Sequence, residues 1–163
     1  MGRAAIIIGI FYFYTGGKMG GQSKETTDIK LEIINTADTG QLKNLYREAG
    51  WWDEYQDNKD PELINKIIKG SFCFVAASIN DRIIGMGRAI SDGACDAYIQ
   101  DVVVLNEFRG KQIGVSIMNE LIKYLQSKNI TWITLISEPE AVLFYQKYGF
   151  SRMNGYIPFI LEK

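Results

Sequence analysis

Apolar and polar residues alternate along the chain from residue 28 onward, and the period of the alternation predicts the secondary structure. In "DIKLEIIN", residues 28–35, the period is two, which is typical of a strand with one buried face. After Asp38 the apolar residues recur at helical spacing. Asp38 and Gln41 together have the form of a capping box, and Gly50 is a stop signal, so the pattern predicts a helix between them.

The same criteria predict a second helix and then a longer series of elements. Asp60 and Pro61 are typical of a helix start, and Gly70 is typical of a helix end. The remaining predicted elements, in chain order, are strands over 71–78, 82–90 and 96–105, a helix from 113 to about 128, a strand over 130–136, a short helix over 138–149, and closing strands over 150–153 and 156–163 around the turn Asn154-Gly155.

This order of elements predicts an α/β fold, with an α+β mixed sheet at its centre and helices on both faces of that sheet. The strand–helix–strand unit over 98–136 is expected to be parallel. Ligands of such sheets bind where the strands diverge at their carboxyl ends. One domain is expected to span residues 28–163.

Residues 1–27 form an atypical apolar N-terminal segment and linker. The run "AAIIIGIFYFY", residues 4–14, is shorter than the roughly 20 residues that span a bilayer, so no stable membrane insertion is expected. Three interpretations stay open: an added strand or intermolecular contact, a cleaved or membrane-touching segment, or a start-site artefact with Met19 as the true start. The first is preferred because so apolar a run needs cover, and it leaves a homodimer open.

Composition and charge exclude several classes of site. The chain of 163 residues has no histidine, and Cys73 and Cys95 do not form a Cys-x-x-Cys motif. Zinc sites of the Cys/His kind and Ser-His-Asp or Cys-His catalysis are therefore excluded, and no metal is expected. Both cysteines are expected to be small buried hydrophobic residues of a reduced, cytoplasmic protein. The net charge of -1 gives no general attraction for nucleic acid, so any anion site must be local.

The most informative stretch is "VVVLNEFRGKQIG", residues 102–114. An apolar strand ends in a basic loop that contains glycine, and a helix follows. This arrangement binds phosphate through the free N–H groups at a helix start. A solvated basic turn is the competing interpretation. The spacing fits neither a Walker loop nor the G-x-G-x-x-G dinucleotide fingerprint.

The longer stretch "YIQDVVVLNEFRGKQIG" resembles the pyrophosphate-binding motif of the GNAT superfamily of N-acetyltransferases, Q/R-x-x-G-x-G/A after a strand of the type "DVVV". Arg109 matches the first motif position and Gly114 the last, whereas Gln112 stands where the family usually has its first motif glycine. "LYREAGWW", "RIIGMGRAISDG" and "AVLFYQKYGF" also look like this family, in the expected order. The resemblance covers roughly residues 28–163.

The resemblance implies an acetyl-CoA-dependent N-acetyltransferase that binds acetyl-CoA in the cleft between the strands of Val103 and Leu135. It assigns acetyl-CoA binding to these residues: Val102, Val103, Val104, Leu105, Arg109, Gly110, Lys111, Gln112, Ile113, Gly114, Val115 and Tyr145. The loop of the family binds phosphate mainly through backbone N–H groups. Gln112 therefore still supplies a backbone N–H donor. Compared with glycine, it reduces the conformational freedom of the loop and the room for a ligand.

The resemblance also implies catalytic roles for Tyr145 and Val103. Tyr145 matches the tyrosine that protonates the sulfur of coenzyme A, and the unperturbed phenol pKa of about 10 suits an acid. Core packing is the alternative role for this side chain. The N–H of Val103 is the expected donor to the acetyl carbonyl oxygen.

The base that takes the proton from the amine is less defined. Asp101 is a candidate base or a structural carboxylate, and Asp92, Glu138 and a water chain are alternatives. Gln100 stands where relatives such as glucosamine-phosphate acetyltransferases have an acid. Strand alternation would place Asp101 and Gln100 on opposite faces, so that only one of them faces the amine.

The acceptor is expected to be a small-molecule or peptide amine that receives the acetyl group directly. Candidate substrate-binding residues are Trp51, Trp52, Arg88 and Gln100, with Tyr55 on the same loop as the tryptophans. Hydrophobic cover for the sheet edge is the alternative role of the tryptophans. The alternatives to a transferase are a non-catalytic acyl-CoA-binding or regulatory domain, and an interaction module that uses the N-terminal segment.

Overall fold

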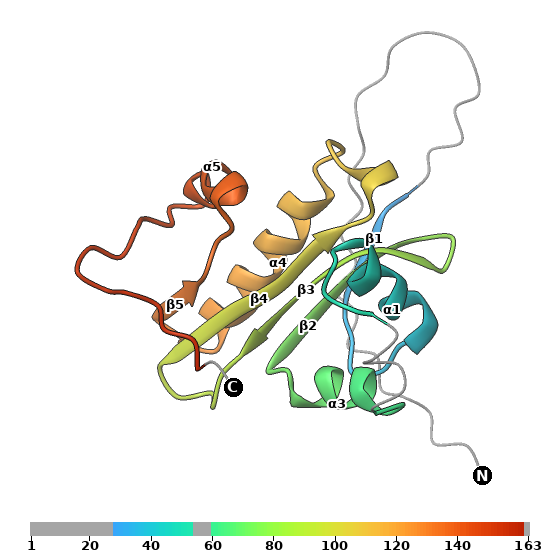
Figure 1. The fold of residues 1–163 in the computed structure, drawn as a ribbon, viewed down its shortest axis with the longest axis horizontal. Helices are drawn as coiled ribbons and strands as arrows, with labels where there is room; N and C mark the ends of the chain where they lie inside the picture. The colour runs from blue at the N-terminus through green and yellow to red at the C-terminus, as the bar shows by residue number, and fades with distance from the viewer. Residues whose placement is uncertain (1–27, 54–59, 162–163) are drawn as a thin grey trace, which may run out of the picture.

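Five strands lie side by side in the order of the sequence, and helices cover both faces of the sheet that they form (Figure 1). The computed structural model describes residues 28–53 and 60–161. The strand bounds are Lys30–Ile33 for β1, Cys73–Ile79 for β2, Arg82–Ile90 for β3, Asp96–Val104 for β4 and Trp132–Leu135 for β5. The predictions for the N-terminal segment and for Tyr55 lie outside the described residues.

The pairing of the strands changes once across the sheet, from antiparallel to parallel. Strands β1 to β4 are antiparallel to their neighbours, whereas β5 is parallel to β4, which confirms the predicted parallel unit. The parallel pairing is short, because it begins with Asp96 opposite Trp132 and ends with Ile99 opposite Leu135. Strand β4 therefore continues over residues 100–104 beyond its pairing with β5.

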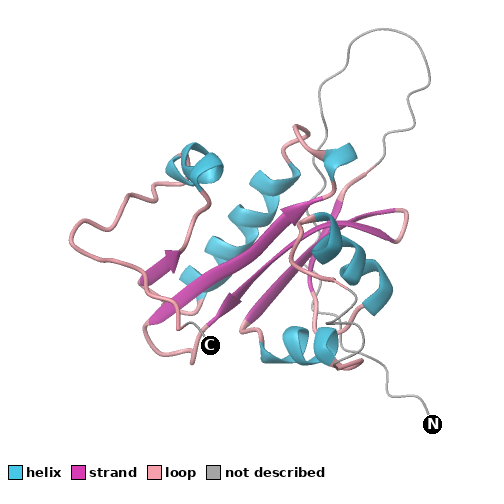
Figure 2. Cartoon of the chain, viewed as in Figure 1, coloured by secondary structure: helices cyan, strands magenta, loops and turns pink. Residues whose placement is uncertain are grey.

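The helices divide between the two faces (Figure 2). Their bounds are Thr39–Glu48 for α1, Leu63–Gly70 for α3, Ile113–Ser127 for α4 and Val142–Gln146 for α5. Helices α1 and α3 lie on one face of the sheet, and α4 lies on the other face (Figure 1). Helix α3 begins two residues after the predicted first helical residue, Pro61.

Helix α1 begins as the capping pattern predicts. The side chain of Asp38 accepts a hydrogen bond from the N–H of Gln41 at 2.9 Å, which satisfies one free donor of the first turn. The side chain of Gln41 does not return to the cap. Its Oε1 accepts from the N–H of Ile83 at 2.6 Å, and its Nε2 donates to the carbonyl of Asp81 at 3.3 Å. These two bonds tie the first turn of α1 to the hairpin between β2 and β3.

Helix α4 packs closely on the sheet because two glycines of β3 face it. A Cβ atom on Gly87 would lie 2.8 Å from Cγ2 of Ile117 and 3.0 Å from Cδ1 of Leu121. A Cβ atom on Gly85 would lie 3.0 Å from Cδ1 of Ile117. Ile117 and Leu121 are fully buried. Their contact with the backbone of β3 fixes the start of α4 beside the carboxyl end of β4.

The C-terminal part of the chain differs from the sequence prediction. The short helix and the turn at Asn154-Gly155 are present, and Gly155 has φ of 81°. Residues 150–161 nevertheless contain no strand, so the predicted closing strands are wrong. Strand propensity takes effect only against a partner edge, and Pro158 has no N–H to donate to one.

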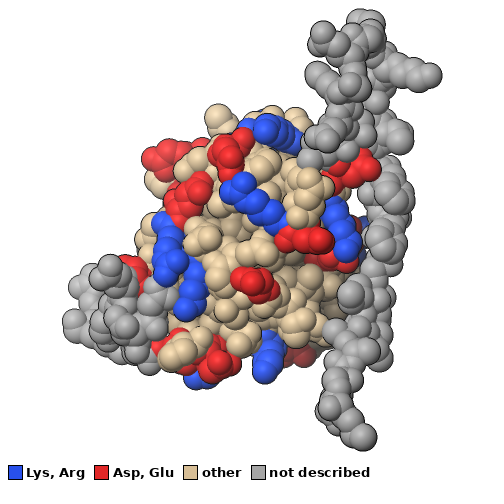
Figure 3. Space-filling model, turned by 90° about the vertical axis from the view of Figure 1, so that its right-hand side faces the viewer, with Lys and Arg blue, Asp and Glu red and all other residues tan. Residues whose placement is uncertain are grey.

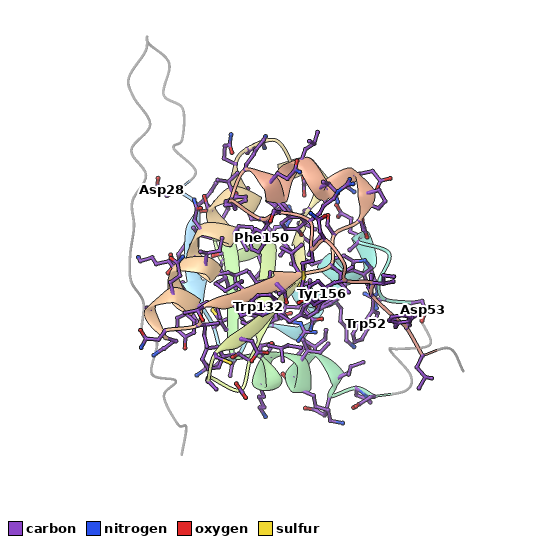
Figure 4. The ribbon with its side chains drawn as sticks, turned by 90° about the vertical axis from the view of Figure 1, so that its left-hand side faces the viewer. Asp28, Trp52, Asp53, Trp132, Phe150 and Tyr156 are labelled. Carbon is purple, nitrogen blue, oxygen red and sulfur yellow. The ribbon has the colours of Figure 1, made fainter. Side chains whose placement is uncertain are left out.

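The C-terminal residues instead form an exposed apolar segment. The large apolar side chains between residues 156 and 161 are exposed over 67–93% of their surface. In Figure 4, Phe150 and Tyr156 lie on the same side of the molecule as Trp132 of β5, which is 54% exposed. Residues 156–161 are called the C-terminal apolar segment below.

The two cysteines have different environments. Cys73 is buried in β2, and burial raises the pKa of its thiol to about 12, with a further contribution from the charge of Glu120. Cys95 is exposed beside the start of β4, so the prediction that both cysteines are buried is wrong for Cys95. Cys95 lies at the end of the turn between β3 and β4, away from the core, so its side chain stays exposed.

We expect Gly87→Ala to lower the free energy of unfolding by about 1–3 kcal/mol, because the new methyl group must push Ile117 and Leu121 away from β3. Urea unfolding would measure the change. Gly70→Ala is the matched control, since a Cβ atom there meets nothing within 4 Å. Equal stability of the two variants would contradict the packing argument.

Candidate active site

A cleft of about 800 Å³ lies where β4 extends beyond β5, within the size range of small-molecule sites. One wall is β4 from Val102 to Val104, the floor is the loop and first turn of α4, and the other wall is α5 with the turn before it. The predicted site residues that line it are Trp51, Val102, Val103, Val104, Arg109, Gly110, Gln112, Ile113, Gly114, Val115 and Tyr145. Segments far apart in the sequence therefore meet in the cleft, whereas Leu135, predicted on its second wall, is absent from the described lining.

The loop before α4 keeps a conformation that can hold phosphate although Gln112 replaces a motif glycine. Gln112 is the N-cap of α4 and adopts the left-handed conformation, with φ of 64° and ψ of 8°. Gly110 is also left-handed, with φ of 76°. The carbonyl of Gln112 accepts a hydrogen bond from the N–H of Ser116 at 3.0 Å, so the first turn of the helix forms normally.

The start of α4 supplies donors for an anion. The first N–H groups of a helix have no partner inside the helix, and the side chain of Gln112 does not cap them. They carry a partial positive charge. A Cβ atom on Gly114 would make only ordinary contacts, the nearest 3.5 Å from Phe144, so packing does not require this glycine. Its missing side chain leaves room in the cleft, and the start of α4 therefore has both the donors and the space for an anion.

Two basic residues of the loop are held by contacts of their own. Arg109 donates from Nε to the carbonyl of Val104 at 3.1 Å, which closes the loop onto the end of β4. Lys111 places Nζ 4.9 Å from the ring centroid of Phe108 and is absent from the described lining of the cleft. On the face drawn in Figure 3, basic and acidic side chains are interspersed, so that face presents no broad basic surface.

The register of β4 decides which backbone groups face the cleft. The N–H of Leu105 donates to the carbonyl of Ile84 at 2.9 Å, and Val103 lies opposite Met86. Along a strand every second N–H points to the same neighbouring strand. The N–H of Val103, two residues before Leu105, therefore also points toward β3. This differs from the prediction that Val103 donates into the cleft. The same alternation turns the backbone groups of Val102 and Val104 away from β3.

Leu105 also differs from its predicted role. Its N–H is taken by Ile84, its side chain is only 5% exposed, and it is absent from the described lining of the cleft. The carbonyl of Val104, by contrast, is the acceptor that Arg109 reaches from the cleft side. The backbone of Val102 and Val104 can therefore contact a ligand of the cleft directly, whereas that of Leu105 cannot.

Tyr145 lies in the cleft wall and is half-buried. Its ring packs on Phe144 at 5.1 Å and on Phe150 at 6.3 Å between centroids. Burial raises the pKa of its phenol, and the negative charge of Glu138 raises this pKa further. Tyr145 therefore keeps its proton at neutral pH, as a proton donor must.

Asp101 is held by two donors on the α1 side of the sheet. The hydroxyl of Tyr46 donates to its Oδ2 at 2.8 Å, and Nε of Arg88 donates to the same oxygen at 2.5 Å. The Gln100 amide is assigned with its oxygen toward Arg88, where it accepts from Nη2 at 2.5 Å and from Nη1 at 3.0 Å. Arg88 and Gln100 are both absent from the described lining of the cleft.

The prediction that Asp101 and Gln100 face opposite sides is wrong. Both side chains reach Arg88, which lies opposite Gln100 in the register. The reason is a bulge at Asp101, whose φ of 55° interrupts the alternation of the strand. Regular alternation carries no signal for such a bulge.

The double tryptophan divides between the cleft and the core. Trp51 is 39% exposed and lines the cleft, and its ring centroid lies 6.3 Å from that of Tyr46. Trp52 is 7% exposed and packs on Tyr46, with 5.8 Å between ring centroids. Of the two tryptophans, Trp51 therefore faces a ligand of the cleft and Trp52 covers the core.

The two other candidate bases lie at opposite ends of the sheet. Asp92 belongs to the turn between β3 and β4, where its Oδ1 accepts from the N–H of Ala94 at 2.9 Å. That turn is at the start of β4, whereas the cleft is at its end. Glu138 lines the cleft and acts on the pKa of Tyr145, so it lies on the same wall.

Several cleft residues were not singled out by the sequence reasoning. Phe144 precedes Tyr145 in α5, and Tyr148 lies two residues after the end of this helix and has a buried hydroxyl without a hydrogen-bond partner among the described residues. Ala141, Phe144, Tyr145 and Tyr148 all line the cleft, and their helical spacing in the sequence would have identified them. The role of Tyr46 has no local sequence signal, because its partner Asp101 is 55 residues away.

Comparison with known proteins places the chain among acetyltransferases. Residues 46–156 match the model of an acetyltransferase (GNAT) domain. The chain is 44% identical over 131 residues to the uncharacterized N-acetyltransferase ycf52 of Porphyra purpurea, which covers 77% of this chain and 72% of that protein. It is 41% identical over 119 residues to the histone acetyltransferase TAP1 of Glycine max, over 69% of this chain and 52% of that protein.

Solved structures agree with this placement. A protein of meticillin-resistant Staphylococcus aureus described as a probable acetyltransferase has a TM-score of 0.69 and 26% identity, over 83% of this chain and 98% of its own. Glucosamine-6-phosphate N-acetyltransferase of Arabidopsis thaliana has a TM-score of 0.63 at 18% identity, over 82% of this chain and 99% of its own. The second likeness shows the fold alone.

The comparisons leave the compartment undecided. GCN5-related N-acetyltransferase 2 of Arabidopsis thaliana, 39% identical over 69 residues, which are 42% of this chain and 27% of that protein, is named as chloroplastic. Among residues 28–53 and 60–161, no helix has the length and hydropathy to cross a bilayer. The cytoplasmic location stays a prediction.

We expect Gln112→Gly to raise the free energy of unfolding by about 0.5–1 kcal/mol, because left-handed strain of roughly 1–2 kcal/mol is removed and part of it is offset by added freedom in the unfolded chain. Gln126→Gly, the same change inside α4, should lower it by roughly 0.5–1 kcal/mol. Urea unfolding of both variants gives the comparison. A loss of stability in both would contradict the strain at Gln112.

Proposed function

The chain belongs to the GNAT family of acetyltransferases, and we propose that it transfers an acetyl group from acetyl-CoA directly to a primary amine. The observation that carries the proposal is the cleft in which the end of β4, the start of α4 and Tyr145 meet. When bound, acetyl-CoA supplies the acetyl thioester. The start of α4 would hold its pyrophosphate, and the end of β4 would hold its pantetheine arm.

Backbone groups of β4 would orient the thioester. The N–H of Val102 faces away from β3 and is the proposed donor to the acetyl carbonyl oxygen, in place of Val103. A fixed backbone N–H stabilises the negative charge that develops on this oxygen, and a fixed donor needs no reorganisation. The side chains of Val102 and Val104 leave this end of the cleft apolar, which strengthens the hydrogen bond.

Tyr145 would protonate the departing sulfur. It lines the cleft, and burial raises the pKa of its phenol, so it is protonated when the thiolate forms. The phenolate of Tyr145 is a stronger base than the thiolate, so the proton must pass to the sulfur as the C–S bond breaks, and the phenolate then regains a proton from water. The hydroxyl of Tyr145 is the only group that this step requires of α5.

Glu138 is the proposed base. A base must be free to accept a proton, and Asp101 is occupied by the cation of Arg88 and by the hydroxyl of Tyr46. Asp92 lies at the far end of β4. Glu138 is exposed, lines the cleft and faces the same space as Tyr145, so it could take the proton from the amine directly or through one water.

The acceptor is a small molecule or a peptide with a primary amine. Trp51 borders the cleft and can place its ring over a cationic or apolar group. The printed names of relatives include a histone acetyltransferase and a glucosamine-6-phosphate N-acetyltransferase, so both peptide and sugar amines are reasonable first acceptors to assay. The alternative, a non-catalytic acyl-CoA-binding domain, is disfavoured by the presence of both Tyr145 and Glu138 in the cleft.

The exposed C-terminal apolar segment supports a homodimer. The two aromatic side chains, Tyr156 and Phe159, can bury roughly 150–250 Å² each, and three large aliphatic residues add to this area, toward the roughly 800 Å² per partner of a stable interface. We propose a second copy of the chain as the partner, because a two-fold axis brings the same apolar segment to both sides of an interface.

We expect wild type to bind acetyl-CoA in calorimetry and to release thiol in the presence of an amine. Tyr145→Phe should bind acetyl-CoA with little change and lose turnover by about 10²-fold, because only the proton donor is removed. Glu138→Gln should lose turnover similarly, most strongly at low pH, where the amine carries its proton. The assays use a panel of sugar, amino acid and peptide amines.

Matched variants control for general damage. Tyr124→Phe removes a phenol on the far part of α4, and Glu140→Gln removes a carboxylate two residues from Glu138; neither residue is in the described lining of the cleft. Both should keep wild-type turnover. Binding of acetyl-CoA by wild type without turnover on any amine would favour the acyl-CoA-binding domain.

We expect wild type to sediment as a dimer and Phe159→Asp to sediment as a monomer, because the new charge would be buried at the apolar contact. Asn44→Asp, an exposed change of the same charge on α1, should stay dimeric. Sedimentation equilibrium measures all three. A wild-type monomer would end the proposal.

A further inference from the structure

The bulge in β4 is a strained point at the centre of the proposed site. Between the pairs Arg88–Gln100 and Met86–Val103, one residue of β3, Gly87, lies opposite two residues of β4, Asp101 and Val102. Asp101 takes up the extra residue with a left-handed φ of 55°. This conformation favours glycine, because a Cβ atom crowds the backbone there.

The bulge sets the direction of the backbone that follows it. In a regular strand every second N–H points to the same side, so one inserted residue reverses the pattern beyond it. Without the bulge, the group that faces the cleft at Val102 would face β3. The left-handed turn at Asp101 therefore decides whether the N–H of Val102 is available to a ligand.

Side chains from two other elements hold Asp101 in place. Tyr46 of α1 donates to Oδ2 at 2.8 Å and Arg88 of β3 donates to the same oxygen at 2.5 Å. The side chains of Arg88 and Asp101 are only 13% and 21% exposed, and Tyr46 is 4% exposed. Arg88 uses its remaining donors on Gln100. The carboxylate of Asp101 is thus held by donors from α1 and from β3, and the positive charge of Arg88 balances its negative charge.

The charge state of this cluster suits a fixed scaffold. Burial raises the pKa of the Tyr46 phenol, and the Asp101 carboxylate raises it further, so Tyr46 remains a donor throughout the working pH range. A carboxylate that accepts from a guanidinium and a phenol on one oxygen gains little by taking a proton from an amine.

We propose that Tyr46, Asp101 and Arg88 form a positioning network that holds the β4 bulge and thereby aims the N–H of Val102 at the acetyl carbonyl. The proposal rests on the proposed function and deepens it. It assigns Asp101 a structural role in catalysis, and it assigns the hydroxyl of Tyr46 a role although this side chain does not line the cleft. A donor displaced by 1 Å can cost about 10²-fold in rate, so the network matters for turnover.

Three substitutions of Asp101 separate a positioning residue from a base. Asp101→Asn keeps an acceptor oxygen for Tyr46 and a side chain that tolerates the left-handed region. Asp101→Gly keeps the left-handed backbone and loses the network. Asp101→Ala loses both. Positioning predicts that kcat falls in the order Asn, Gly, Ala, with a loss of about 10²-fold for Ala. A base would lose the same large factor in all three.

The second measurement does not depend on turnover. The infrared carbonyl band of acetyl-CoA carrying ¹³C in the acetyl group shifts to lower frequency when a donor hydrogen-bonds the oxygen. Wild type and Asp101→Asn should show the shifted band, and Asp101→Ala should show the band of free acetyl-CoA. Affinity for coenzyme A itself should be unchanged in every variant, because the start of α4 holds its phosphates. Tyr46→Phe should give a partial shift.

Asp92→Ala is the matched control, since it removes a carboxylate from the turn at the other end of β4. It should keep the wild-type band and kcat, and urea unfolding should show that each variant is folded. If wild type binds acetyl-CoA with a shifted band and all Asp101 variants keep that band, the positioning role is overturned while the transferase assignment stands. If wild type does not bind acetyl-CoA, both proposals are overturned.

Discussion

The site depends on the divergence of β5 from β4 after a short parallel pairing. Beyond the pair Ile99–Leu135, the backbone groups of β4 that face away from β3 have no strand to bond. Unpaired backbone groups are costly when buried, so this end of the sheet must stay open to solvent or to a ligand. Arg109 satisfies one of them, the carbonyl of Val104. The cleft is therefore a consequence of an incomplete sheet.

The second constraint is the close packing of α4, which brings the donors of its first turn to that open edge. Gly85 and Gly87 leave no side chain between the helix and β3, and Ile117 fills the space. The same glycines thus serve stability and site geometry. Gly87 also lies opposite the bulge at Asp101. The same residue of β3 therefore packs against α4 and pairs with the bulged part of β4. Packing and catalysis share one short region of β3.

The sequence predicted those features that periodicity and short motifs encode. The strands of the meander, the parallel unit and the loop before α4 follow from local patterns. The bulge at Asp101 does not, because it depends on Tyr46 and Arg88, which are distant in sequence. The direction of the Val103 N–H follows from the register that the bulge sets, so that prediction failed with it. The closing strands failed for another reason: "YIPFIL" has strand propensity, but propensity alone supplies no partner.

The left-handed residues explain why Gln112 is tolerated. Among the described non-glycine residues with positive φ, the others are Asn80, Asp81, Asp101 and Asn129, all of the two types that accept this region most easily. Gln112 has no such tolerance, so its conformation must come from its surroundings. Its carbonyl bonds the N–H of Ser116, and the next residue, Ile113, is buried in the core. The packed helix imposes the loop conformation, and the backbone donors remain in place although the motif glycine is absent.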